Sequence, residues 1–474
     1  MPPTHSVQLA AHVGQREMKY LLKDLLTRAT RRLALLTLRL RRKTFDAISL
    51  HQFQKTGSCS AILRREAEGL EVAAPQFIGD YGKLALSPEA KITVHAPRLE
   101  IVEFADAAVM GGTELVFVGH QAIHADVVDP KRDMFRAEVE GGAKFDPRTQ
   151  KLSVPGPAMR STSPRKPIHV GEAVSLLGEC SGNYAHWLIE ILPKLAALDD
   201  YESYRSLPLL VDGGIHPIFY QTLALLNTHC RPIQRVNLWQ TVTVKRLIYM
   251  TPPAYTAPEN RVFFLTGKLP APSSASFLFS KGELAVLRRK AVAAAQRYIA
   301  AGAVLRTLPT ITRIDYGGTT AAIVRDARAD LGYSEVKRVY LRRAAVSAGN
   351  PRQMIGAERV ESILADFDFL AVDPAALSFA EQVMLLQDAD YVVAPIGAAL
   401  ANLIFAPPGR KVIALAPYYR DADYYYFSNM MGVLGHELYY ILGPQLDQPN
   451  VHLLHRDYMV DLQALKDALQ RLCG

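Results

Sequence analysis

The sequence lacks the features that mark several common classes of protein. No apolar run reaches the roughly 18 to 20 residues needed to cross a bilayer, and no apolar segment with a cleavage site follows the first residues. Among 474 residues there are only four cysteines and no Cys-x-x-Cys pair, so neither a zinc site nor a disulfide framework is indicated. No Gly-x-Gly-x-x-Gly motif opens either half, which disfavours a dinucleotide oxidoreductase. We expect a protein of the reducing cytoplasm.

The excess of one charge sign is also small. The chain has 54 Lys and Arg against 46 Asp and Glu, a net charge of +8, and this predicts no nucleic-acid groove. Much of the positive charge lies near the N-terminus, where apolar residues in 15–43 recur at three- and four-residue steps among Lys and Arg. Such a basic amphipathic helix would either contact an anionic membrane surface or pack its apolar stripe on the protein body or on a second copy.

The length exceeds what one hydrophobic core usually supports, so we expect several domains. After the helical segment 1–45, residues 46–165 hold short β-type segments bounded by Pro, Gly and Asp. From residue 168 onward, strand-like and helix-like segments alternate, which predicts parallel sheets. The expected fold is therefore α/β, with two Rossmann-like units over 166–325 and 326–474 that face a cleft.

The pattern also places individual elements. Strands are expected near 174–178, 207–212, 246–250, 337–341, 367–372, 391–394 and 411–415, and helices over 217–226, 281–301, 357–365 and 378–387 and from 459 onward. Ligands of such sheets bind at the carboxyl ends of the strands.

Several polar groups of the second unit follow directly after expected strands. Arg342 and Arg343 come after one strand, where guanidinium groups can hold phosphate. Gly397 follows another, and Ala398 begins a short helix whose free N–H groups favour an anion, with Asn402 able to fix the loop or reach a ribose or base. The alternatives are a closely packed strand-to-helix turn and solvated arginines.

His186 and Glu190 lie one helical turn apart in the first unit. An imidazole can act as a general base near neutral pH, and a carboxylate at i+4 can orient it or be the base itself. The alternative is structural, with the imidazole capping backbone groups and Trp187 filling the core.

A metal site is not expected. The Asp-x-Asp pattern of metal-dependent transferases occurs three times, and a short pattern that recurs is weak evidence. Only Asp421 and Asp423 follow a strand in a way that could face the cleft, and the neighbouring Tyr-rich segment 418–427 could stack on a sugar or pack between the units.

One set of motifs resembles glycosyltransferase family 61, which includes bacterial capsular-polysaccharide enzymes. The set consists of Asn183-Tyr184-x-His186-Trp-Leu-x-Glu190, Arg342, Ser378-Phe-x-Glu381-Gln382 and Gly397-Ala398-x-Leu-x-Asn402-x-x-Phe405-x-Pro-Pro-Gly409. The resemblance covers roughly residues 170–420. It implies a GT-B fold, a nucleotide-sugar donor held by Arg342, Arg343, Glu381, Gln382, Gly397, Ala398 and Asn402, and inversion at the anomeric carbon without a metal or other cofactor. Asn183 and Tyr184 would then lie on the acceptor side.

Two departures from the family pattern stand out. Ile396 replaces the usual His before Gly-Ala, and Arg352-Gln-Met-Ile-Gly356-Ala357 lacks the usual Asn-Glu pair. We expect a glycosyltransferase that moves a sugar, most simply from a UDP-sugar, to a glycan or glycolipid in surface polysaccharide synthesis. It would be cytoplasmic or peripheral on the inner membrane face. The alternative is a scaffold protein that binds a nucleotide-sugar or glycan without turnover.

Overall fold

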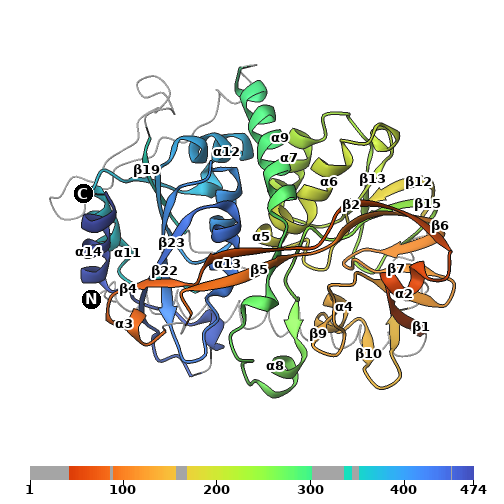
Figure 1. Cartoon of the computed structure of the whole chain (residues 1–474), viewed down its shortest axis with the longest axis horizontal. Coiled ribbons are helices and arrows are strands. Elements are labelled where there is room, and N and C mark those ends of the chain that lie inside the picture. The colour runs from red at the N-terminus through yellow and green to blue at the C-terminus, as the bar shows by residue number, and fades with distance from the viewer. Residues whose placement is uncertain are drawn as a thin grey trace, which may run out of the picture.

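The protein is a mixed α/β structure with two large sheets (Figure 1). The computed structural model describes residues 42–85, 89–155, 168–300, 336–343, 352–449 and 451–473. Most of the expected N-terminal helix and the proposed domain boundaries near 165 and 325 lie outside the described residues. Strand β1 (Arg42–Ser49) pairs with β11 (Lys151–Pro155), so residues 42–45 lie in a strand rather than in that helix.

The first sheet contains the parallel unit that the alternating pattern predicted. Its strands are β12 (Ile168–Ser175), β13 (Leu209–Asp212), β14 (Ile233–Val236) and β15 (Thr241–Met250). They run parallel in the order β15-β12-β13-β14. The chain thus adds strands on both sides of β12, and the carboxyl ends of β12 and β15 meet at a topological switch point.

The β-rich segment extends this sheet on the other side of β15. Strand β6 (Leu99–Met110) pairs antiparallel with the whole of β15, from Met110 opposite Thr241 to Ile101 opposite Met250. The remaining strands of this sheet are β2 (Cys59–Arg65), β7 (Val116–Val118), β8 (Gln121–His124), β10 (Lys144–Asp146), β11 and β1. Both strands are largely buried, with continuous buried runs at Leu99–Val102 of β6 and Leu247–Met250 of β15, so their apolar side chains lie in the core.

The second sheet is parallel throughout, in the order β20-β19-β21-β22-β23-β4. Its strands are β19 (Arg338–Leu341), β20 (Leu370–Val372), β21 (Tyr391–Pro395), β22 (Lys411–Tyr418), β23 (Glu437–Pro444) and β4 (Gln76–Ile78). The order reverses between β19 and β21, which defines a second switch point. Strand β4 comes from the N-terminal β-rich segment, so that segment contributes to both sheets.

Helices cover the sheets and join the two halves. Helix α9 (Lys281–Ala300) packs against α6 (Leu192–Leu198) and α7 (Pro217–Leu226) of the first half and α12 (Phe379–Asp388) of the second. Figure 1 shows α9 between the two sheets, and strands β3 (Glu68–Ala73) and β5 (Lys91–Ala96) running from one half to the other. The other helices are α2 (Leu50–Gln54), α3 (Asp80–Lys83), α4 (Arg136–Val139), α5 (Tyr184–His186), α8 (Arg261–Thr266), α11 (Ala357–Ala365), α13 (Tyr425–Leu434) and α14 (Leu462–Cys473).

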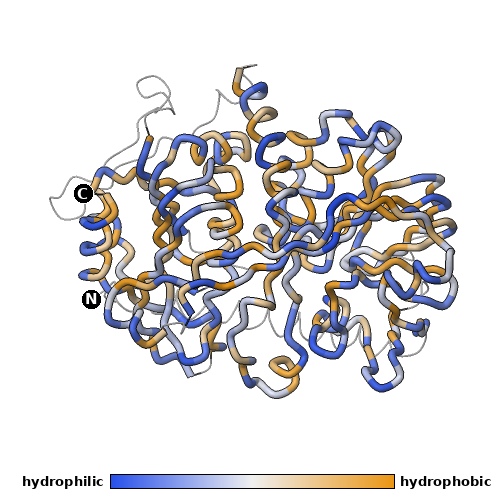
Figure 2. The backbone as a smooth tube through the Cα atoms, viewed as in Figure 1, coloured by the Kyte–Doolittle hydropathy of each residue, from blue (hydrophilic) through white to orange (hydrophobic). Residues whose placement is uncertain are grey.

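The largest hydrophobic core is continuous between the halves. It contains Trp187 and Leu209 from the first half together with Phe405 and Met430 from the second. Figure 2 shows hydrophobic stretches along the strands of both sheets. Because burial of apolar area is the main favourable term in folding, this shared core fixes how the two halves meet. Among the described residues, no helix combines the length and the apolar character needed to cross a membrane.

Candidate active site

His186 and Glu190 lie just beyond the carboxyl end of β12. Asn183 caps helix α5, because its Oδ1 accepts a hydrogen bond from the Ala185 N–H at 3.0 Å. A π-helix from Trp187 to Ile191 follows. His186 Nδ1 lies 2.8 Å from Glu190 Oε1, and the two side chains are 13% and 9% exposed. A carboxylate beside Nδ1 favours the tautomer that carries its proton on Nδ1. The other nitrogen, Nε2, can then accept a proton.

Trp187 anchors this segment in the core. Its Nε1–H donates to Thr222 Oγ1 at 2.8 Å, and its ring stacks on Phe219 at a centroid distance of 5.3 Å. These contacts confirm that Trp187 fills the core. His186, in contrast, is not the capping residue and keeps part of its ring accessible.

A buried group of charges lies behind the pair. Lys194, only 1% exposed, forms an ion pair with Glu114, and burial raises the pKa of that carboxyl. Burial likewise raises the pKa of Glu179 to about 7, although its carboxylate accepts the N–H groups of Glu114 and Arg136. Buried carboxylates with raised pKa values often accompany functional sites. Sequence reasoning missed this cluster, because its members come from separate segments.

Asp212 at the end of β13 holds the loop that leads to His186. Its Oδ2 accepts hydrogen bonds from Ser181 Oγ at 2.6 Å and from the Gly178 N–H at 3.3 Å, and its Oδ1 accepts the Gly112 N–H at 2.6 Å. Burial raises the pKa of Asp212 to about 6, while the hydrogen bonds lower it.

Two arginines converge on the switch point of the second sheet. Arg343, directly after β19, donates from Nη1 to the carbonyl oxygen of Ile396 at 3.1 Å, and Arg352 donates from Nη2 to the same oxygen at 3.2 Å. Gly397 lies against this pair, since a Cβ built there would meet Arg343 Nη1 at 3.1 Å. Burial, and then the nearby charge of Arg352, lower the pKa of Arg343. Two like charges held together in this way form a suitable position for an anion.

The other predicted donor residues have different surroundings. Arg342 is turned to helix α11, where its Nη2 lies 2.5 Å from Glu361 Oε2. Glu381 closes a capping box at the start of α12, accepting the Ser378 N–H at 2.7 Å. Ala398 begins the 3₁₀ helix Ala398–Phe405 beside Gly397. Arg352, which sequence reasoning noted only as a remnant of a motif, therefore takes the place at the switch point that was expected for Arg342.

Tyr184, Gln382 and Asn402 lie together at the junction of the two halves. The Tyr184 hydroxyl donates to Asn402 Oδ1 at 2.8 Å and lies 3.3 Å from Gln382 Oε1, which also accepts from Asn402 Nδ2 at 3.0 Å. Asn402 is 1% exposed. The three residues form an inter-half hydrogen-bond cluster, so they position the His186 segment relative to the Gly397 loop.

Aromatic residues of α13 complete the surroundings of His186. The Tyr426 ring centroid lies 6.5 Å from that of His186, and burial together with the Glu190 charge raises the pKa of Tyr426. Asp423 accepts the N–H groups of Tyr425 at 2.9 Å and Ser273 at 3.3 Å.

Within the described ranges, no group of three or more His, Cys, Asp or Glu side chains could hold a metal ion.

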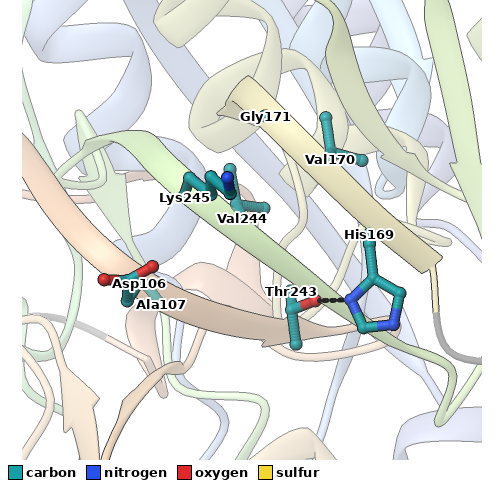
Figure 3. Close-up of a pocket in the computed structure, with 8 residues that line it drawn as sticks. All are labelled: Asp106, Ala107, His169, Val170, Gly171, Thr243, Val244 and Lys245. Carbon is teal, nitrogen blue, oxygen red and sulfur yellow. Dashed lines mark hydrogen bonds between the residues drawn. The ribbon is translucent and has the colours of Figure 1, made fainter.

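A hollow of about 550 Å³ on the first sheet lies away from these groups (Figure 3). His169 and Thr243 line it, joined by a hydrogen bond of 2.5 Å between Nδ1 and Oγ1. His169 is at the start of β12, whereas His186 follows the opposite end of that strand. The hollow therefore belongs to the amino edge of the sheet, where ligands of parallel sheets rarely bind.

Comparison with protein families places these two carboxyl edges within one matched range. Residues 184–413 match the family model described as Glycosyltransferase 61. The matched range includes His186, Arg343 and Gly397. This match identifies the chain as a glycosyltransferase. No curated protein matches it.

Proposed function

We propose that the protein is an inverting glycosyltransferase of the GT-B type that takes its sugar from a UDP-sugar without a metal ion. The observation that carries this proposal is the pair Arg343 and Arg352 on one carbonyl oxygen beside Gly397. Two guanidinium groups at a sheet switch point suit a diphosphate, because they match both the negative charge and the arrangement of the phosphate oxygens. They supply the positive charge that metal-dependent transferases take from a divalent cation.

His186 serves as the general base in this proposal. Nε2 takes the proton of the acceptor hydroxyl while that oxygen forms a bond to the anomeric carbon. The bond from that carbon to the phosphate oxygen breaks, and its electron pair leaves with UDP, whose charge Arg343 and Arg352 stabilise. Glu190 at Nδ1 orients the imidazole and stabilises the imidazolium that forms. Attack opposite the leaving group inverts the anomeric configuration.

The acceptor in this proposal is a glycan or glycolipid of surface polysaccharide assembly. The basic segment 15–43 would hold the enzyme on the anionic inner face of the membrane, because clustered Lys and Arg residues bind such surfaces. Packing of the same segment on a second copy remains the alternative.

Release of UDP from a panel of UDP-sugars, with and without EDTA, tests the proposed function. We expect at least one donor to release UDP, at a rate that EDTA leaves unchanged, and Arg343→Ala to slow that release. Activity that EDTA abolishes would contradict metal independence. UDP binding without release from any donor and acceptor pair would favour the scaffold alternative.

A further inference from the structure

A second hollow, of about 530 Å³, opens between the two halves next to the arginine pair. Leu454 and Tyr419 form its edge on the second half. The carbonyl oxygen of Leu454 accepts from Arg352 Nη1 at 3.3 Å, so this edge adjoins the proposed diphosphate position. Most of the remaining wall comes from segment 256–277 of the first half. The volume is in the range of small-molecule sites. We call this hollow the junction pocket.

A row of aromatic rings connects the junction pocket to His186. Phe277 lines the pocket, and its ring centroid lies 5.5 Å from that of Tyr426. His186 is another ring neighbour of Tyr426, at a centroid distance of 6.5 Å. A molecule in the pocket would therefore lie beside the proposed diphosphate position and on the side of the junction that leads to the proposed base.

The wall has the composition of a carbohydrate site. Phe263, Phe277 and Tyr419 offer aromatic surface against which the C–H face of a sugar ring packs. Asn260 offers an amide, although its Oδ1 already accepts the N–H groups of Val262 and Phe263. Thr256 Oγ1 is buried and makes no hydrogen bond to the described residues. A buried hydroxyl without a partner is costly, and a ligand hydroxyl would supply one.

The charges of the wall select against an anionic ligand. Glu259, Asp421 and Asp423 line the pocket. The cation among the lining residues is Arg132, and it is already bound to Asp133 through bonds of 2.7 and 3.0 Å. A carboxylate or phosphate in the pocket would thus meet like charge, whereas hydroxyl and ammonium groups would find acceptors.

We propose that the junction pocket binds the acceptor glycan and takes neutral or amino sugars rather than uronic acids or phosphorylated sugars. This assignment rests on the proposed function. The acceptor is assigned to this pocket because most of its lining residues come from the half that carries His186. The arginine pair, proposed to hold the donor, belongs to the other half. A nucleoside is the competing occupant, and the experiment below separates the two.

The test measures binding of methyl glycosides and uridine to the full chain by saturation-transfer difference NMR. The probes are methyl glucoside, methyl galactoside, methyl xyloside, glucosamine and methyl glucuronide. Two matched variants each replace a hydroxyl by a methyl group of similar size. They are Thr256→Val in the junction pocket and Thr243→Val in the hollow at the amino edge of the first sheet. We expect Thr256→Val to weaken glycoside binding roughly 3- to 10-fold, the loss of one hydrogen bond, and Thr243→Val to leave it unchanged.

Charge selection is tested in the same assay. Methyl glucuronide should bind at least about 10-fold more weakly than methyl glucoside, and Glu259→Gln should reduce that difference. Equal binding of glucuronide and glucoside would overturn the charge assignment. Absence of glycoside binding, an equal response of both Thr variants, or loss of uridine instead of glycoside in Thr256→Val would overturn the pocket assignment. UDP calorimetry on the same samples reports separately on the proposed donor site.

Discussion

The hydroxyl of Tyr184 donates a 2.8 Å hydrogen bond to Asn402 Oδ1, across 218 positions of the chain. Tyr184 belongs to the short helix that ends at His186, and Asn402 belongs to the 3₁₀ helix that follows Gly397. This bond therefore joins the candidate base to the loop at the second switch point. It is buried at the junction, where an unmade hydrogen bond is costly.

A double-mutant cycle should detect this coupling. We expect Tyr184→Phe and Asn402→Ala each to lower the free energy of unfolding, with an interaction energy of about 0.5 to 3 kcal/mol, the range for residues in contact. Urea denaturation measures it. As a control, Tyr298→Phe removes a hydroxyl from a residue that is 42% exposed and should have no effect. Strict additivity of the two junction variants would show that the bond contributes nothing.

Arg343 and Arg342 are adjacent residues with different partners, and they offer a matched comparison at the proposed donor site. Arg343→Ala should weaken UDP binding by roughly 1.5 to 3 kcal/mol, the range for hydrogen bonds to charged groups. Arg342→Ala should have a smaller effect, because its guanidinium is bound to Glu361. Isothermal titration calorimetry with UDP gives both values. The reverse order would move the diphosphate toward α11 and away from Gly397.

The pKa of Asp212 gives the stability of the fold a defined pH dependence. The value rises from an ordinary 3.8 to about 6 on folding, so the folded state holds a proton that the unfolded state releases between these values. The contribution of Asp212 to stability is thus complete below pH 3.8 and is lost as the pH rises through 6. At about 1.4 kcal/mol per unit, the loss is about 3 kcal/mol.

The variant Asp212→Asn isolates this effect. Urea denaturation between pH 3.5 and about 8 gives the free energy of unfolding of both proteins. The wild-type value minus the variant value should fall as the pH rises toward 6 and level off above it. Glu103→Gln is a control of opposite sign, since Arg246 lowers the pKa of Glu103. A flat difference curve for Asp212 would mean that folding leaves the pKa of its carboxyl unchanged.

Membrane binding through the N-terminal segment can be tested by truncation. Because β1 begins at Arg42, deletion of residues 1–41 removes the segment and keeps that strand intact. We expect the truncated protein to lose sedimentation with anionic vesicles and to keep its melting temperature. Aggregation or a changed oligomeric state would instead show that the apolar stripe packs on protein.

Periodicity predicted the parallel units well, because each helix and strand there forms from neighbouring residues. Helices α7 and α11 begin and end where the sequence predicts, and β22 starts at Lys411 as expected. Strand β4 could not be predicted in the second sheet, since its partner β23 is far away in the chain. The sequence analysis also missed helix α13 and strand β23. The Tyr-rich segment 418–427 was interpreted as a loop that contacts a sugar or packs between the units, although α13 begins within it.

The site was predictable where it depends on local spacing. The i and i+4 positions of His186 and Glu190 brought their side chains together, as expected. Which of Arg342 and Arg343 faces Gly397 could not be read from sequence, because neighbouring residues at a strand end point in opposite directions. The burial of Gln382 and Asn402 at the junction, likewise, follows from how the halves pack and has no local signal.

Steady-state kinetics of His186→Ala tests the central claim most directly. Loss of the imidazole should lower kcat for UDP release in the presence of acceptor by about 100-fold or more, the usual contribution of a general base. The Kd for UDP and the melting temperature should stay near those of the wild type. If His186→Ala keeps its activity while Glu190→Gln loses it, the carboxylate is the base; if both variants turn over normally, the base is not in this helix and the proposed mechanism is wrong.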